Sequence, residues 1–271
     1  MTISPSELTR PDRHIFLSPH YDDIALSCGG TAATLASAGR TPEVALIFGD
    51  HPDPAQPMTA FADALHRQWG MSAAEVIAGR RAEESVASMA LGTCDRFLPF
   101  RDAIYRGERY TSDNDLFGTV HPDESEIPGQ IIEHLRLCTD GASTTRIYAP
   151  LAVGSHVDHQ HAYHAGLELI RRGWDVWFYE DLPYALRPEN VAARRPILAG
   201  DGIQAGPAVD VRDAWNRKID AIMAYPSQLA TIFGQYVGIG STRSAIDESM
   251  REYAVKAGSG VAAERFWAAN G

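Results

Sequence analysis

Residues 14–23 read HIFLSPHYDD, and they indicate how the chain begins to fold. The first five residues are largely apolar, which predicts a short buried strand over 14–18. From Asp23 to Gly39 the apolar side chains recur at helical spacing, and the glycine marks the end of the predicted helix. A buried strand that runs directly into a helix is typical of folds in which strands and helices alternate.

The rest of the chain continues this alternation. Further strands are predicted at 44–48, 96–100, 146–149 and 174–179, and further helices at 72–91, 127–138, 158–172 and 211–224. Such alternation implies a parallel sheet that is covered by helices on both faces. We therefore predict an α/β fold, a Rossmann-like parallel sheet in a three-layer sandwich, with ligands bound beyond the carboxyl ends of the strands.

The length of 271 residues suits a single α/β domain. We expect one domain over residues 1–271, with a core at about 14–230 and a variable C-terminal extension over 231–271. Within that extension, residues 234–260 are rich in glycine and serine and show no clear periodicity. This segment either covers the substrate or lies on the surface.

The composition excludes several classes of function. The formal net charge is −11, and Lys and Arg form no cluster that could bind phosphates, so we expect neither a nucleic-acid partner nor an anionic membrane partner. Residues 1–13 lack the apolar core of a signal peptide, and no segment is long and apolar enough for a membrane span. Three cysteines without CxxC spacing suit a reducing compartment, so we predict a cytoplasmic protein and leave a homo-oligomer open.

Two short motifs follow predicted strands and carry the residues suited to chemistry. The first is SPHYDD at 18–23, and the second is GSHVDHQH at 154–161. A single His-x-x-Asp is more often a helix cap than a metal site, and Asp158 alone could be an N-cap. However, His156 and His159 share one helix face, and two strand ends of one parallel sheet can face each other. Together the motifs offer two histidines and one carboxylate to a metal and leave positions open for water and substrate, which is typical of a catalytic site.

With these motifs the sequence resembles the PIG-L, or LmbE-like, family of zinc-dependent N-deacetylases. Members of this family carry Pro-His-x-Asp-Asp after the first strand and His-x-Asp-His after a later one. Two further blocks are similar to the family as well, and the resemblance spans roughly residues 14–230. The matching segments are PHYDD at 19–23, RRAEE at 80–84, LG at 91–92, HVDH at 156–159, KIDAI at 218–222 and YPSQ at 225–228.

The resemblance implies a metal-dependent hydrolase that removes an N-acetyl group from an amino-sugar-containing small molecule or glycoside, such as an N-acetylglucosaminyl compound. It implies Zn²⁺ as cofactor, while two histidines and one carboxylate would also suit Fe²⁺. The metal would polarise the amide and activate water, and a free carboxylate nearby would take the proton. The roles carried over are His20, Asp23 and His159 as metal ligands, Asp22 as general base, His156 as electrostatic stabiliser or proton donor, and Asp158 as the residue orienting His156.

Substrate contacts are predicted from residues near the strand ends. Asp102 and Arg106 follow the third predicted strand, and Arg80 belongs to the helix block, although each could also be a solvated surface charge. Tyr21 stands where many relatives have proline, and it either lines the pocket or packs near the strand end. Ile24 stands where many relatives have glutamate, so the substrate need not be close to theirs.

The sequence also allows other metal-site residues and other classes of function. The segments 51–53 and 121–124 mimic the first metal motif, but the second lacks a preceding strand, and the first would at most border the pocket. The pair Glu180-Asp181 follows the fifth strand and could bind hydroxyl groups, whereas His161 points to a different helix face from His159. A metal-dependent phosphoesterase would need more asparagine and histidine at strand ends, and a catalytically inactive sugar-binding module would not need the complete set of motif residues present here.

Overall fold

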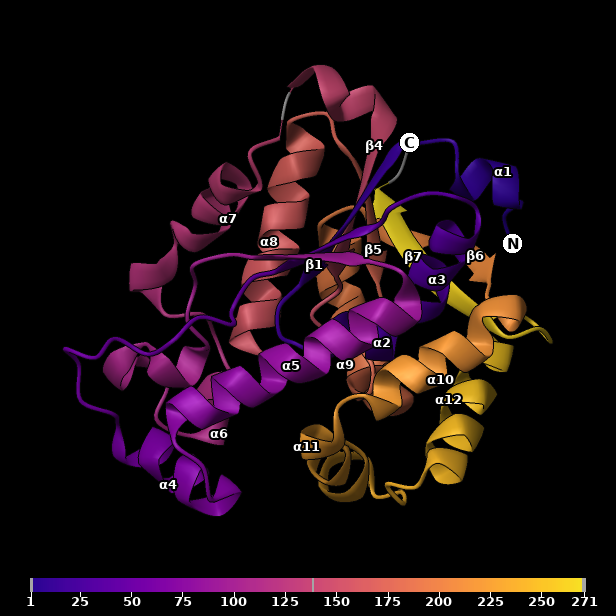
Figure 1. Cartoon of the computed structure of the whole chain (residues 1–271). Helices are drawn as coiled ribbons and strands as arrows, with labels where there is room; N and C mark the ends of the chain where they lie inside the picture. Colours follow the sequence, from indigo (N-terminus) through magenta and orange to yellow (C-terminus); the bar gives the residue numbers. More distant parts are fainter. Residues whose placement is uncertain (1, 138, 270–271) are drawn as a thin grey trace.

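The computed structural model describes residues 2–137 and 139–269, and its centre is a seven-stranded sheet in the order β3-β2-β1-β4-β5-β7-β6 (Figure 1). Strands β1 to β5 pair in parallel, whereas β7 pairs antiparallel with both β5 and β6. The strands are β1 (Arg13–Ser18), β2 (Glu43–Leu46), β3 (Cys94–Phe97), β4 (Thr145–Pro150), β5 (Asp175–Tyr179), β6 (Ile203–Asp210) and β7 (Ala263–Ala269).

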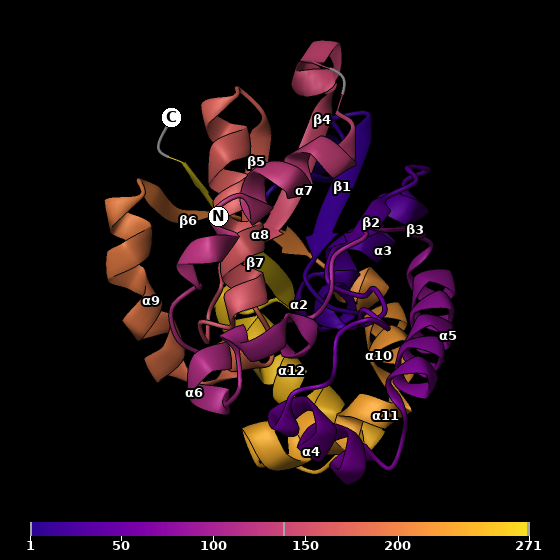
Figure 2. The ribbon, with the colours of Figure 1, turned by 90° about the vertical axis from the view of Figure 1, so that its left-hand side faces the viewer.

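Helices cover both faces of this sheet, which confirms the predicted three-layer α/β fold. One layer holds α2 (Asp23–Ser27), α3 (Gly29–Ser37), α5 (Ala73–Leu91), α10 (Trp215–Met223) and α12 (Arg243–Ala257), with α10 packed against the other four. The other layer holds α7 (Ile127–Leu135), α8 (Val157–Arg171) and α9 (Pro188–Gly200), and Figure 2 shows these helices across the sheet from α3, α5 and α10. Strand β4 between the layers is buried at every residue, so the core lies on both faces.

Short helices gather at the carboxyl ends of the parallel strands. They are α4 (Ala60–Trp69), α6 (Asp113–Leu116), α11 (Pro226–Leu229) and the π-helix η7 (Ala230–Val237), whereas α1 (Pro5–Leu8) lies near the N-terminus. In both views α4, α6 and α11 lie at the same end of the molecule (Figures 1 and 2). No helix in the described part of the chain is long and apolar enough to cross a membrane.

Several element boundaries differ from the sequence predictions. The helix predicted over 23–39 is broken at Cys28 into α2 and α3, because the Glu264 carboxylate accepts the free backbone N–H groups of Gly30 at 2.9 Å and Thr31 at 2.6 Å. The strand predicted over 96–100 starts earlier and ends at Phe97. The helix predicted over 127–138 ends at Leu135, and Cys138 lies outside the described residues.

The chain after residue 200 contributes more regular structure than the sequence indicates. Strands β6 and β7 were not predicted, and the predicted helix over 211–224 begins only at Trp215. Glycine and proline occupy the middle of β6, where the pairing with β7 shifts register, and this obscures the alternation that identifies a strand. The segment 234–260 is more than a surface loop, because it includes α12, whose Ile246 and Met250 are buried. Strand β7 beyond it is hydrogen-bonded on both sides within the sheet.

Candidate active site

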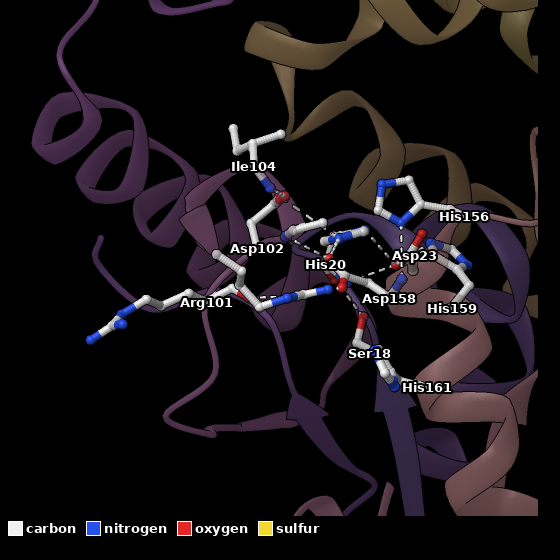
Figure 3. A network of polar contacts seen from close by, with 12 residues as sticks. Ser18, His20, Asp23, Arg101, Asp102, Ile104, His156, Asp158, His159 and His161 are labelled. Carbon is white, nitrogen blue, oxygen red and sulfur yellow. Dashed lines mark hydrogen bonds and ion pairs between the residues drawn. The ribbon is translucent and has the colours of Figure 1, made fainter. Parts of the chain in front are cut away.

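The end of β1 presents His20, Asp22 and Asp23 at the carboxyl edge of the sheet. The Ser18 hydroxyl donates to the His20 carbonyl at 2.6 Å, and the backbone N–H of His20 donates to Asp23 Oδ2 at 2.7 Å. These two bonds fix the turn between β1 and α2. As a result the His20 ring and the Asp23 carboxylate point to the same side of the sheet edge (Figure 3).

The loop between β4 and α8 brings the second motif to the same place. Ala152 and Ser155 have φ of 58° and 66°, which is strained for residues other than glycine. A Cβ on Gly154, which has φ of 90°, would lie 2.7 Å from Cγ of Tyr184, so only glycine fits there. This tight loop ends at His156, the N-cap of α8, and Asp158 and His159 follow in the first helical turn.

The side chains of the two motifs converge on a common point that fits a divalent metal. Asp23 Oδ2 lies 3.4 Å from His159 Nε2 and 3.7 Å from His20 Nδ1. Ligands placed about 2.0–2.2 Å from one ion at tetrahedral angles lie about 3.3–3.6 Å apart. His159 Nε2 is also buried without any hydrogen-bond partner among the described residues. A buried acceptor without a partner is costly, so this nitrogen is suited to coordinate an ion.

Each of these two histidines is held by a carboxylate through its other ring nitrogen. His20 Nε2 lies 3.0 Å from Asp158 Oδ2, and His159 Nδ1 lies 2.6 Å from Asp181 Oδ1. Metal-ligating histidines typically donate their second N–H in this way, which fixes the tautomer and leaves the other nitrogen free for the metal. Asp181 follows β5, and its other oxygen accepts the Val153 N–H at 2.9 Å, which holds it in place.

His156 lies beside this group but makes different contacts. Donor atoms of His20, His156 and His159 lie within 4.8 Å of one another, so a ligand set of three histidines is also geometrically open. However, His156 Nδ1 accepts the backbone N–H of Asp158 at 3.2 Å, and burial together with the neighbouring His20 holds the pKa of His156 well below its usual value. A neutral ring with an accepting Nδ1 carries its proton on Nε2, which suits a donor better than a ligand.

Among the described residues, the Asp158 carboxylate forms its hydrogen bonds with groups other than the His156 ring, although its charge acts on that ring; that it orients His156 stays a prediction. It accepts from His20, from the Ala103 N–H at 3.1 Å and from Arg106 at 2.6 Å. Burial opposes the charge on Asp158, but Arg106 and His20 outweigh it and hold the pKa of Asp158 well below the usual range. In turn, burial opposes the charge on His20, but the hydrogen bond to Asp158 and the charge of Asp102 raise the pKa of His20 to about 9.

Arg106, predicted as a substrate contact, lies behind this layer and is not among the residues that line the cavity beside His20. Its guanidinium bridges Asp158 and Glu124, with Nε 2.9 Å from Glu124 Oε1. Glu124 also accepts from Tyr110 at 2.8 Å, and it lies 3.0 Å from His161 Nε2. Glu124, the last residue of the segment 121–124, and His161 thus form a buried layer of polar contacts behind Asp158. Neither belongs to the groups of side chains in the described part of the chain that could hold an ion.

The remaining predicted residues divide between the cavity and its surroundings. Asp22 and Asp102 line an open cavity of about 260 Å³, together with Arg80, whose Nη2 lies 3.1 Å from Asp22 Oδ1. Tyr21 does not line this cavity, because its hydroxyl donates to the Gly49 carbonyl at 2.5 Å. Glu180, the neighbour of Asp181, binds Trp267 and Tyr253 and has a structural role.

Comparisons with known proteins agree with this geometry. Residues 15–170 match the family described as "PIG-L: GlcNAc-PI de-N-acetylase". A 2′-N-acetylparomamine deacetylase from Streptomyces fradiae is 31% identical over 225 residues, which cover 82% of this chain and 75% of that protein.

Two solved structures share the fold across nearly the whole chain. A deacetylase in the biosynthesis pathway of teicoplanin superposes with a TM-score of 0.72 at 25% identity, covering 94% of this chain and 96% of the other. The A40926 pseudoaglycone deacetylase superposes with a TM-score of 0.69 at 26% identity, covering 95% and 97%.

Proposed function

This chain belongs to the PIG-L family of de-N-acetylases, and from this premise we propose that it removes the acetyl group from an amino sugar within a small glycoside. The chain is a hydrolase of the deacetylase class with a His/Asp metal site, as the sequence predicted. The observation that carries the proposal is the convergence of His20 Nδ1, His159 Nε2 and Asp23 Oδ2 beside an open cavity that His20 and Asp23 line. We propose these three atoms as ligands of Zn²⁺, while Fe²⁺ suits the same donors.

The residues around the proposed ligands supply the remaining steps of amide hydrolysis. A bound metal polarises the amide carbonyl and lowers the pKa of water. Asp22 lines the cavity, and its ion pair with Arg80 keeps the carboxylate in position to accept a proton from the attacking water. His156 also lines the cavity, and its Nε2–H is suited to donate to the carbonyl oxygen as negative charge develops there.

The charges of the cavity favour a small glycoside over a nucleotide sugar. Arg80 is the only Lys or Arg among the lining residues in the described part of the chain, and it pairs with Asp22. Asp23, Asp102 and Asp113 line the same space. A diphosphate would therefore meet mostly negative charge and would find no free cation to bind.

The test is a screen of N-acetylated sugars in which released acetate and the mass loss of one acetyl group are measured. We expect turnover of simple N-acetylglucosaminides and of acetylated amino-sugar natural products, with one divalent ion per chain and loss of activity after treatment with a strong chelator. Better turnover of UDP-N-acetylglucosamine or a chitin oligomer would contradict the substrate assignment. A protein that binds these sugars without releasing acetate would instead be the inactive sugar-binding module, and release of phosphate from phosphoesters would favour the phosphoesterase. The cytoplasmic location stays a prediction.

A further inference from the structure

The cavity has two chemically different parts. His20, Asp22, Asp23 and His156 form its polar floor. Apolar side chains from α4, the end of α6 and η7 make up much of the remaining lining, beside the polar residues Asp113, Gln228 and Thr231. The apolar residues concerned are Leu65, Trp69, Leu116, Phe117, Ile232 and Tyr236.

Two aromatic side chains at the mouth are exposed although they are large and apolar. Trp69 and Tyr236 each keep 36% of their surface exposed, and both line this cavity. Tyr236 packs against Phe117 and Tyr184, with ring centroids 5.9 Å and 5.3 Å apart, whereas Trp69 packs edge-on against His66 of its own helix. Exposed apolar side chains that gather around one cavity are typical of a ligand-binding site, because a ligand removes them from water.

The apolar part is continuous with the reacting groups. The ring of Phe117 lies 5.3 Å from that of His156, and the ring of Tyr184 lies 5.9 Å from that of His159. One ligand molecule can therefore place its amide beside His156 and still contact the aromatic rings of Phe117 and Tyr184. The cavity measures about 260 Å³ and is open to solvent, so a group attached to the sugar can extend past Phe117 toward Trp69 and Tyr236.

We propose that the sugar of the substrate carries an apolar group, an alkyl- or aryl-like aglycone, that packs against Trp69, Phe117 and Tyr236. This inference rests on the proposed function, because the amide must reach the floor for hydrolysis. With the acetamide at the floor, the rest of the sugar extends toward the mouth. An apolar aglycone there covers the exposed aromatic surface, whereas a hydroxylated one leaves that surface without a partner.

Binding of deacetylated products tests this assignment without any need for turnover. Hexyl and methyl 2-amino-2-deoxyglucosides are titrated into the metal-loaded protein in a calorimeter. Each buried methylene strengthens binding about fourfold, so even partial burial of the hexyl chain should favour the hexyl glycoside about tenfold or more. In Trp69→Ala and Tyr236→Ala the ratio of the two affinities should fall toward one. Ile197→Ala, which truncates an apolar side chain 50% exposed on α9, is the matched control and should keep the wild-type ratio.

Several outcomes would overturn the assignment. Equal affinity for the hexyl and methyl glycosides would do so, and so would a hexyl preference that both cavity variants retain. A kinetic comparison separates the aglycone from the acyl group: kcat/KM should rise from methyl to hexyl N-acetylglucosaminide, but not from N-acetyl to N-hexanoyl on the methyl glycoside. The reverse result would place the apolar group on the acyl side. If no acetate is released from any compound but the hexyl preference persists, the proposed function fails and the apolar site stands.

Discussion

Neighbouring aspartates at the end of β1 have different surroundings, and these surroundings separate their roles. Asp23 Oδ2 accepts the His20 N–H and lies 3.4 Å from His159 Nε2, so it belongs to the proposed ligand set. Asp22 points into the cavity and contacts Arg80 at 3.1 Å instead. Its carboxylate is therefore available to accept a proton, although the two residues are adjacent in the sequence.

Asp22→Asn should lower turnover and leave metal binding intact. The asparagine keeps the size of the side chain but cannot take a proton, and general-base catalysis commonly contributes about 10²- to 10⁴-fold. We therefore expect kcat to fall by about that factor. The variant should bind as much metal as the wild-type protein. Steady-state kinetics and metal analysis of the same preparations measure both quantities.

Asp23→Ala is the matched control for this experiment. It removes one of three proposed protein ligands, so metal content and activity should fall together. Loss of metal in Asp22→Asn, or near wild-type turnover with full metal, would mean that the two carboxylates have been assigned to the wrong roles.

The residues of the two motifs could be identified from sequence, whereas the hydrogen-bonded pairs that they form could not. His20, Asp23 and His159 belong to short local patterns that follow apolar strands. Their partners come from other strand ends: Asp158 is 138 residues from His20, and Asp181 is 22 residues from His159. Arg106 shows the limit most clearly, since its position after a strand suggested a substrate contact while its guanidinium points back to Asp158. Only the packing of the strands defines such pairs.

At the scale of elements, the central strand β1 carries a histidine whose environment disfavours its charge. His14 is 1% exposed, its Nδ1 lies 3.0 Å from the Tyr148 hydroxyl, and its Nε2 lies 3.1 Å from the Pro11 carbonyl. Burial, together with the charge of Arg146, lowers the pKa of His14 to about 4. In the unfolded chain the same side chain takes up a proton near pH 6.5.

Stability should therefore fall as the pH drops from about 6.5 to about 4. Above this window the side chain is neutral in both states. Within this window the unfolded chain binds a proton that the folded chain does not. The free energy of unfolding therefore falls by about 3 kcal/mol across the whole window. His14→Gln cannot titrate, so its free energy of unfolding should depend less on pH than that of the wild type. Urea unfolding at several pH values between about 7.5 and 4.5 measures the difference.

The control for His14→Gln is His51→Gln, which changes an exposed histidine in the loop after β2. This variant should follow the wild-type pH dependence. Should His14→Gln show the same slope as the wild type, the proton uptake would have to come from other groups.

Element boundaries were predictable where local chemistry defines them. Helix α5 begins after Ser72, whose side chain and Glu75 form a capping box, and it ends at Gly92 in the left-handed conformation. The break between α2 and α3 was not predictable in the same way, because the carboxylate that accepts the freed N–H groups is Glu264, 234 residues from Gly30. Local patterns locate an element, but a distant side chain can interrupt it.

At the scale of the whole molecule, the last strand, β7, connects one helical layer to the sheet through side-chain contacts. Glu264 of β7 binds the start of α3, and it also pairs with Lys218 of α10, whose Nζ lies 2.5 Å away. Lys218 additionally donates to the Ser27 carbonyl of α2 at 3.2 Å. Both charged residues are buried, with exposed fractions of 1% for Lys218 and 6% for Glu264. One ion pair thus joins three helices and the strand that lies between β5 and β6.

Removing either partner alone should destabilise the whole fold more than removing both. Lys218→Met leaves a buried carboxylate without its cation, and breaking a buried pair in this way costs about 3–5 kcal/mol. Glu264→Gln leaves the buried ammonium group of Lys218 with only uncharged oxygens to bind, so its cost should be similar. In the double variant no unpaired charge remains, and we expect it to recover part of the loss. Urea unfolding of the wild type and the three variants gives the coupling energy between the two residues.

The exposed pair Lys256 and Glu252 on α12 provides the comparison, because its groups are also within 2.6 Å but both side chains are more than 60% exposed. The same substitutions there should change the free energy of unfolding little, since solvent screens exposed pairs. If the double variant at Lys218 and Glu264 loses the sum of the two single losses, the residues do not act as a pair, and β7 is held to the helices by apolar packing alone. If only the buried pair shows a favourable coupling energy, then this ion pair helps to hold the helical layer that carries Asp22, Asp23 and Arg80 to the sheet.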